Sequence, residues 1–274
     1  WGPAGVAPYL DRVDAMVNVE VPVSDNPVSR AFVAAGVELG LSEVAFRQRI
    51  APGVGWFPLN VRGGRREATS IAYLHPLSQL PRHLEVWTET LARRVMIENC
   101  VAVGVETDRG ILRANREVIL TAGSIGSAQL LLLSGVGPAD QLRSLGINVA
   151  ADLPGVGRHL LDHVAAPVVY DLPTPVPRWR LTPFEATMLL QIDADAPAPD
   201  VLFHWGLRVR EKYGDRPRLG SPANGVKASP NVARSRSEGE VRLRSSDPGD
   251  APVIELNYLS DAAGYDRRIL LSAM

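Results

Sequence analysis

Residues 116–137 constrain the fold of this chain more than any other stretch. Residues 118–120 form an unbroken apolar run, which is typical of a strand buried on both faces. The three residues that follow are small, so another backbone or a flat ligand can approach closely. They are Thr121, Ala122 and Gly123.

A strongly apolar helix is predicted next, over residues 128–133. Ser124 and Ser127 can cap its start, and Gly135 and Gly137 mark its end. A strand, a small-residue turn and a helix start together place backbone N–H groups where an anionic or flat ligand can bind. By spacing alone, an ordinary βα unit of an α/β core is the better explanation of the pattern.

Composition narrows the class of protein. The 274 residues are 46% hydrophobic and 22% charged, with a formal net charge of −1, which favours neither nucleic acid nor an anionic membrane as partner. A single cysteine, Cys100, excludes an internal disulfide framework and a cysteine-based metal cluster, and we expect no metal. We find no apolar stretch long enough to span a bilayer, so we expect a cytoplasmic location and no membrane contact.

Two kinds of β-structure are predicted. Residues 84–120 alternate in the manner of a small antiparallel meander. From residue 164 onward, short strands alternate with Pro-rich loops and no βα alternation remains, which indicates a mostly antiparallel sheet. We therefore divide the chain into a first domain, 1–163, and a second domain, 164–274. The fold class expected is α/β, or α+β.

Two titratable residues of the second domain are candidates for a site. Glu185 begins an apolar strand, and a carboxylate among apolar residues can bind a cation because desolvation strengthens its field. His204 ends another strand and precedes Trp205, which can offer a cation–π face. The simpler interpretations are an exposed strand end for Glu185 and a satisfied hydrogen bond for His204.

Two longer motifs resemble a known family. Residues 123–137 read Gly-Ser-Ile-Gly-Ser-Ala-Gln-Leu-Leu-Leu-Leu-Ser-Gly-Val-Gly, and residues 153–163 read Leu-Pro-Gly-Val-Gly-Arg-His-Leu-Leu-Asp-His. Both are similar to segments of the glucose–methanol–choline (GMC) flavin oxidoreductases, in the same order. Ala128 stands where that family usually has Pro.

The resemblance implies an FAD cofactor and a role for each domain. Residues 1–163 would be part of a Rossmann-like FAD-binding domain, whose Gly-rich loop we expect before Trp1. Residues 164–274 would be part of a substrate-binding domain. Ala92 matches the place where the family holds the adenine ring by a main-chain contact. With Thr121, Ala122 and Gly123 it completes the predicted cofactor-binding set.

The resemblance also implies a reaction. Residues 184–206 are similar to the choline-oxidising members of the family, in which the residue matching Glu185 contacts the trimethylammonium group and the one matching His204 lines the active site. A primary alcohol, choline-like or other, would pass a hydride to flavin N5 and become an aldehyde. Oxygen or another acceptor would reoxidise the flavin. The catalytic base is expected beyond Met274, so no catalytic residue is assigned.

Two alternatives stay open. A family relative can use the same pocket for hydroxynitrile cleavage and keep the flavin as structure. The chain can also be a non-catalytic fragment that binds no flavin by itself. For partners we expect a small alcohol and an electron acceptor, and we expect the protein to form a homodimer.

Overall fold

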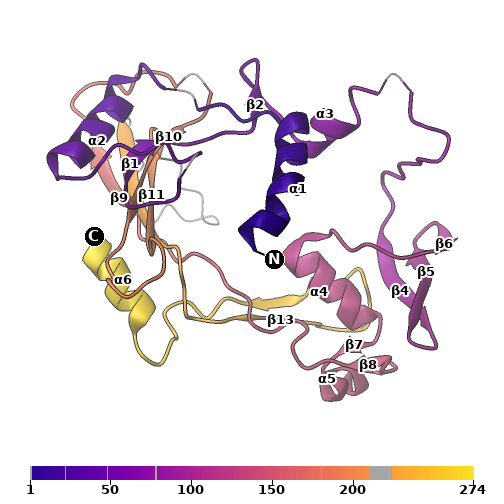
Figure 1. Ribbon diagram of the computed structural model, residues 1–274. Coiled ribbons are helices and arrows are strands. Elements are labelled where there is room, and N and C mark those ends of the chain that lie inside the picture. The colour runs from indigo at the N-terminus through magenta and orange to yellow at the C-terminus, as the bar shows by residue number, and fades with distance from the viewer. Residues whose placement is uncertain are drawn as a thin grey trace. The chain divides into compact units, whose positions relative to one another are not determined.

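The computed structural model describes residues 2–21, 23–47, 49–77, 79–179, 181–209, 222 and 224–274 (Figure 1). The chain divides into two compact units, each assembled from separate segments. Unit 1 comprises Trp1–Leu84, His163–Arg234 and Arg267–Met274, and unit 2 comprises Glu85–Asp162 and Ser235–Asp266. Each unit thus draws on both of the sequence ranges assigned above to an FAD domain and a substrate domain, an assignment that stays a prediction.

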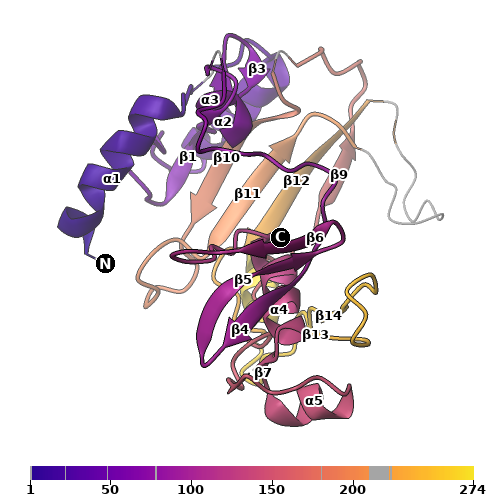
Figure 2. The ribbon, with the colours of Figure 1, turned by 90° about the vertical axis from the view of Figure 1, so that its right-hand side faces the viewer.

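Unit 1 is built on a five-stranded antiparallel sheet with the order β1-β10-β11-β12-β9 (Figure 2). Its strands are β1 (Gly53–Trp56), β9 (Val168–Asp171), β10 (Phe184–Leu190), β11 (Val201–Gly206) and β12 (Gly225–Val232). The remaining elements are α1 (Pro3–Met16), α2 (Pro27–Glu38), α3 (Thr69–Tyr73) and the short hairpin β2 (Val61–Arg62) with β3 (Arg65–Arg66). The antiparallel sheet predicted after residue 164 is confirmed, but its edge strand β1 comes from much earlier in the chain.

Helix α2 covers one face of this sheet. Its start is capped by Asn26, whose side-chain oxygen accepts a hydrogen bond of 3.0 Å from the Val28 N–H. Val33 of α2 packs with Val54 of β1 and with apolar residues of β10 in one buried cluster. A Cβ on Gly36 would lie only 2.8 Å from the Val54 side chain, so a small residue is needed where helix and sheet meet.

Unit 2 contains a three-stranded antiparallel meander and a short parallel pair. Its elements are β4 (Ala92–Glu98), β5 (Val101–Thr107), β6 (Gly110–Arg113), α4 (Gly123–Leu133), β7 (Val136–Gly137), α5 (Ala139–Ser144), β8 (Ala151–Asp152), β13 (Glu240–Arg242) and β14 (Val253–Glu255). Helix α6 (Tyr265–Ala273) begins in unit 2 and continues into unit 1. The meander is confirmed, although it starts at residue 92 and not at 84. Among the described residues, no helix combines the length and apolar character needed to cross a membrane.

Two local predictions around α4 are wrong. Residues 118–120 form no strand, because no neighbouring strand pairs with them in the described part of the chain; Ile119 is 73% exposed. The helix starts earlier than predicted, at Gly123, with Ala122 at the N-cap and no side-chain cap. Ser124 and Ser127 therefore lie inside the helix and do not cap it. A capping side chain belongs to the residue just before the first helical residue, and both serines follow Gly123.

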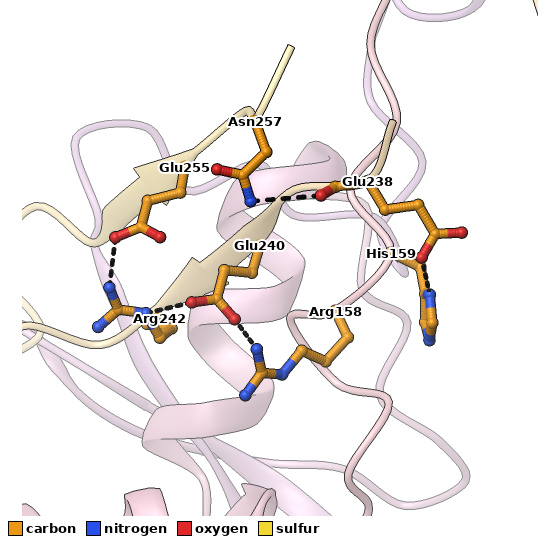
Figure 3. Close-up of polar contacts among 7 residues, drawn as sticks. All are labelled: Arg158, His159, Glu238, Glu240, Arg242, Glu255 and Asn257. Atoms are coloured by element: carbon orange, nitrogen blue, oxygen red, sulfur yellow. Dashed lines mark hydrogen bonds and ion pairs between the residues drawn. The ribbon is translucent and has the colours of Figure 1, made fainter. Parts of the chain in front are cut away.

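The second motif, residues 153–163, is attached to β13 by charged side chains (Figure 3). Arg158 forms an ion pair with Glu240, which also accepts a hydrogen bond of 2.5 Å from Arg242. Arg242 in turn reaches Glu255 of β14 at 2.5 Å. These groups are partly solvated, so each pair stabilises the fold by at most about 1 kcal/mol, and their effect is mainly to orient the loop.

The backbone of the same motif also contacts β13 directly, at Gly157. The Val241 N–H donates to the Gly157 carbonyl at 2.7 Å, and His159 pairs with Glu238 close by (Figure 3). Gly157 has a φ of +79°, and a Cβ there would lie 2.3 Å from the Val241 carbonyl oxygen. Only glycine combines this backbone conformation with this approach.

A buried carboxylate holds the start of α6 in unit 2. Asp266 is fully buried and accepts hydrogen bonds from the Ser235 hydroxyl (2.7 Å), the Arg236 N–H (2.8 Å) and the Ser237 N–H (2.9 Å). Burial by itself would raise the pKa of Asp266, but the hydrogen bonds from Ser237, Ser235 and the backbone outweigh it and lower the pKa. The ionised form is therefore part of the folded structure.

Replacing Gly157 tests the close approach. Gly157→Ala should lower the free energy of unfolding by about 2 kcal/mol or more, since it combines strain at positive φ with a steric clash. The matched control is Gly155→Ala, where a Cβ would meet nothing within 4 Å. Chemical denaturation of the two variants measures the difference, and equal stabilities would contradict the packing described.

Replacing Asp266 tests the buried carboxylate. Asp266→Asn should lower the free energy of unfolding by roughly 1.5–3 kcal/mol at neutral pH, because an amide N–H₂ would face hydrogen-bond donors. Because the folded pKa lies below the ordinary 3.8, Asp266 stabilises the fold above that pH, and this stabilisation is lost as the pH falls through the folded pKa. The variant should thus show a weaker loss of stability in acid than the natural protein. The control is Asp140→Asn, whose side chain is exposed.

Candidate active site

A cavity of about 650 Å³ opens on unit 1, on sheet residues of β10, β11 and β12. Its lining combines aromatic and aliphatic side chains with a few polar groups, as is usual for sites that bind small organic molecules. The lining residues are Phe57, Leu59, Ala165, Pro167, Thr182, Phe184, His204, Lys227, Ser229 and Asn231. Of the sequence-predicted site residues, this set contains His204.

Aromatic rings fix the imidazole of His204 in this cavity. The Phe57 ring stacks on it with centroids 5.4 Å apart and an interplanar angle of 22°. The Phe184 ring meets it edge-on, at 6.1 Å and 81°. Both contacts limit rotation of the imidazole, so its nitrogens have defined directions.

Asn231 favours one of the two neutral forms of His204. The Asn231 side-chain nitrogen donates to the Ser229 carbonyl at 2.7 Å and to the Leu202 carbonyl at 3.0 Å, and these two acceptors fix the orientation of the amide. The same nitrogen lies 2.9 Å from Nδ1 of His204. The amide has only two hydrogens, and the two carbonyls accept them. Because an amide nitrogen does not accept a hydrogen bond, a proton on Nδ1 would have no acceptor here, and the contact favours a neutral ring with its hydrogen on Nε2.

The environment of His204 also disfavours the charged ring. Burial lowers the pKa of His204, and electrostatic interactions with His163 and Lys227 lower it further. The imidazole is therefore neutral at neutral pH. A neutral imidazole with Nε2–H is a hydrogen-bond donor that can bind an alcohol or alkoxide oxygen.

Glu185 does not share the cavity with His204. The pairing of β10 with β11 changes register between Phe184 and Thr187, and such an irregularity redirects the side chains within it. Glu185 is 3% exposed, and its carboxylate accepts a hydrogen bond of 2.8 Å from the hydroxyl of Ser29 in α2. Its role as a substrate ligand stays a prediction from the resemblance.

Trp205, which was expected to offer a cation–π face, also lies away from the cavity. Its ring stacks on Phe32 of α2, with centroids 4.7 Å apart and an interplanar angle of 14°. It belongs with the buried cluster between α2 and the sheet. Trp205 is thus part of the packing that supports β11.

The predicted cofactor residues lie in unit 2. Thr121, Ala122 and Gly123 are exposed at the start of α4, and Ala92 begins β4 opposite Thr107. No side chain caps α4, and a Cβ on Gly123 would meet nothing within 4 Å. The first N–H groups of this helix therefore face open space, which fits an anionic or flat group such as part of a flavin dinucleotide. The assignment of these four residues stays a prediction.

Nine of the ten lining residues were missed by the sequence analysis, among them Phe57, Phe184, Lys227 and Asn231. A signal for three of the nine is present in residues 226–232. Polar Lys227, Ser229 and Asn231 alternate there with apolar or small residues, as expected when one face of a strand borders a site. Phe57 is distant in sequence and gives no such signal.

Comparison with known proteins places the chain in a family. The model of the GMC oxidoreductase family matches residues 1–165. The oxygen-dependent choline dehydrogenase of Brucella anthropi is 33% identical over 95% of this chain and 54% of its own length. The oxygen-dependent choline dehydrogenase of Rhizobium etli is 33% identical over 97% of this chain and 55% of its own length. The chain therefore spans about half the length of these relatives.

Solved structures agree. Pyridoxine 4-oxidase from Mesorbium loti superposes with a TM-score of 0.83 at 27% identity, over 94% of this chain and 52% of that one. An FAD-dependent oxidoreductase from Chaetomium thermophilum has a TM-score of 0.76 at 19% identity, over 94% of this chain and 55% of that one, a likeness of fold alone. The expected fold class is thus confirmed as that of flavoproteins with a Rossmann-type domain. The expected FAD cofactor and oxidoreductase class are those of the matched family.

The two motifs at residues 123–137 and 153–163, the antiparallel sheet of unit 1 and these comparisons agree, and the chain belongs to the GMC oxidoreductase family.

Proposed function

We propose that the protein oxidises a primary alcohol to an aldehyde, with His204 binding the reacting oxygen. The observation that carries this proposal is the imidazole of His204, oriented by Phe57, Phe184 and Asn231 in a cavity of about 650 Å³. When bound, FAD supplies the hydride acceptor for such a reaction.

The residues of unit 1 would act by binding and orientation. Phe57 and Phe184 exclude water from the alcohol carbon and hold the imidazole in place. The Nε2–H of His204 donates to the alcohol oxygen, and this bond strengthens as negative charge develops there. Asn231 keeps Nδ1 unprotonated, so it is a positioning residue.

The start of α4 would contribute in unit 2. Thr121, Ala122 and Gly123 leave room for a cofactor beside the uncapped helix N-terminus, and Ala92 contributes a main-chain contact. The electron acceptor in the second half-reaction would be oxygen or another acceptor. The expected homodimer and the cytoplasmic location are parts of the same proposal.

Anaerobic flavin reduction tests the reaction itself. Mixing the full-length, FAD-loaded protein with a primary alcohol should bleach the flavin absorbance near 450 nm and yield one aldehyde per flavin, since each oxidation transfers two electrons. Release of hydrogen cyanide from a cyanohydrin with the flavin still oxidised would instead establish a lyase. A protein that binds no FAD and converts neither substrate would be non-catalytic.

Replacing His204 tests its role. His204→Phe keeps a ring for the aromatic packing but removes the donor, so kcat/KM for flavin reduction should fall about 100-fold or more. His75→Gln, at an exposed histidine, is the matched control and should leave kcat/KM unchanged. An unaltered rate in His204→Phe would exclude His204 from the reaction.

The pH dependence gives an independent measurement. Because the pKa of His204 is lowered from its ordinary value of 6.5, the imidazole stays neutral down to a pH below that value. The ring then gains a proton, and its Nδ1–H faces the Asn231 amide nitrogen, which accepts no hydrogen bond, so kcat/KM should fall only below pH 6.5. Asn231→Asp, which places an acceptor beside Nδ1, should move this decline to higher pH. A decline that stays in place would contradict the proposed contact.

A further inference from the structure

The described lining of the cavity of unit 1 contains a lysine side chain and no carboxylate. This lysine is Lys227 of β12. The imidazole of His204 is neutral, for the reasons given above. The field inside the cavity is therefore positive.

The position of Lys227 is determined by its neighbours in the sheet. Lys227 pairs with Gly206 of β11, and a Cβ on Gly206 would lie 2.9 Å from Cγ and 3.1 Å from Cε of the lysine. Because Gly206 has no side chain, the aliphatic part of the Lys227 side chain can occupy this space. The ammonium group reaches a point 5.5 Å from the centre of the Phe184 ring, inside the aromatic part of the cavity.

No described carboxylate neutralises this charge. Within the ranges that the structure describes, no ion pair involves Lys227. Glu185, two strands away, faces α2 and is hydrogen-bonded to Ser29. A quaternary ammonium substrate in this cavity would meet a like charge, and like charges brought together out of bulk water repel strongly.

We infer that the alcohol oxidised by this protein carries a carboxylate, which Lys227 binds. This inference rests on the proposed function and narrows its substrate class. The carboxylate pairs with the Lys227 ammonium, the apolar body of the substrate lies against Phe57 and Phe184, and the hydroxyl meets His204. In the reaction the alcohol carbon gives a hydride to FAD and the hydroxyl proton goes to solvent, which leaves an aldehyde with its carboxylate unchanged.

Three alcohols and two variants test this inference in the full-length, FAD-loaded protein. 4-(Hydroxymethyl)benzoate should have a kcat/KM at least about 10-fold above that of neutral benzyl alcohol, and choline should be the poorest of the three. Lys227→Met keeps most of the aliphatic stem and should remove this preference through KM. It should leave benzyl alcohol within about 3-fold of the natural protein. Lys227→Arg should retain the preference.

Ionic strength and the variant Glu185→Gln give two further tests of the carboxylate preference. The preference for the carboxylate should weaken as ionic strength rises, because exposed parts of the ion pair are screened. If choline is instead the best substrate, and Glu185→Gln raises its KM while Lys227→Met does not alter the ranking, the carboxylate inference is overturned. The thermal midpoints of all variants report whether each one folds.

Binding separates this inference from the proposed reaction. Benzoate should bind the protein in calorimetric titration, and Lys227→Met should weaken its binding about 10-fold or more. If no alcohol reduces the flavin while benzoate binding depends on Lys227, the reaction is wrong and the anion site stands. If alcohols are oxidised but neither benzoate binding nor the substrate ranking depends on Lys227, the anion site is wrong and the reaction stands.

Discussion

The change of register between β10 and β11 is the constraint on which the cavity of unit 1 depends. Without it, side chains of β10 would alternate strictly between the two faces of the sheet. With it, Glu185 turns to Ser29 in α2, while Phe184 meets His204 at the edge of its ring. One irregularity therefore separates a buried acidic group from an aromatic, partly polar cavity.

This separation determines the electrostatic character of the cavity. An ammonium and a carboxylate that faced each other would neutralise the field, and a neutral alcohol would suffice as ligand. Here Glu185 is satisfied by a hydroxyl on the helix side, and Lys227 remains in the cavity with Asn231 and His204. Relatives named for choline are thus similar in sequence to this chain, while the described lining of its cavity contains a lysine and no carboxylate.

The sequence predicted those parts of the fold that local interactions determine. The meander of β4 to β6 and the antiparallel strands after residue 164 follow from alternation and loop composition. The strand expected at residues 118–120 did not form, because an apolar run becomes a strand only when a neighbour pairs with it.

The candidate site was predicted only in part, for a similar reason. His204 was found as a titratable residue at the end of a strand, but the direction of Glu185 depends on a register change that cannot be read from the composition. Phe57 reaches the cavity just beyond β1, which pairs with β10 although more than a hundred residues separate them in sequence. Contacts of this range cannot be inferred from periodicity in one segment. The alternation at Lys227, Ser229 and Asn231 was visible, and it needed only the identity of the neighbouring strand to be informative.

The interleaving of the two units has a consequence for folding kinetics. The sheet of unit 1 needs β1 from residues 53–56 and β12 from residues 225–232, and the whole of Glu85–Asp162 lies between them. Unit 2 likewise cannot complete its fold until Ser235–Asp266 has been synthesised. Contacts this distant in sequence make folding slow, since the chain must close long loops before it gains their stabilisation. During synthesis β1 therefore emerges well before its partner strand, and its unpaired edge is the segment of unit 1 that most needs protection from aggregation.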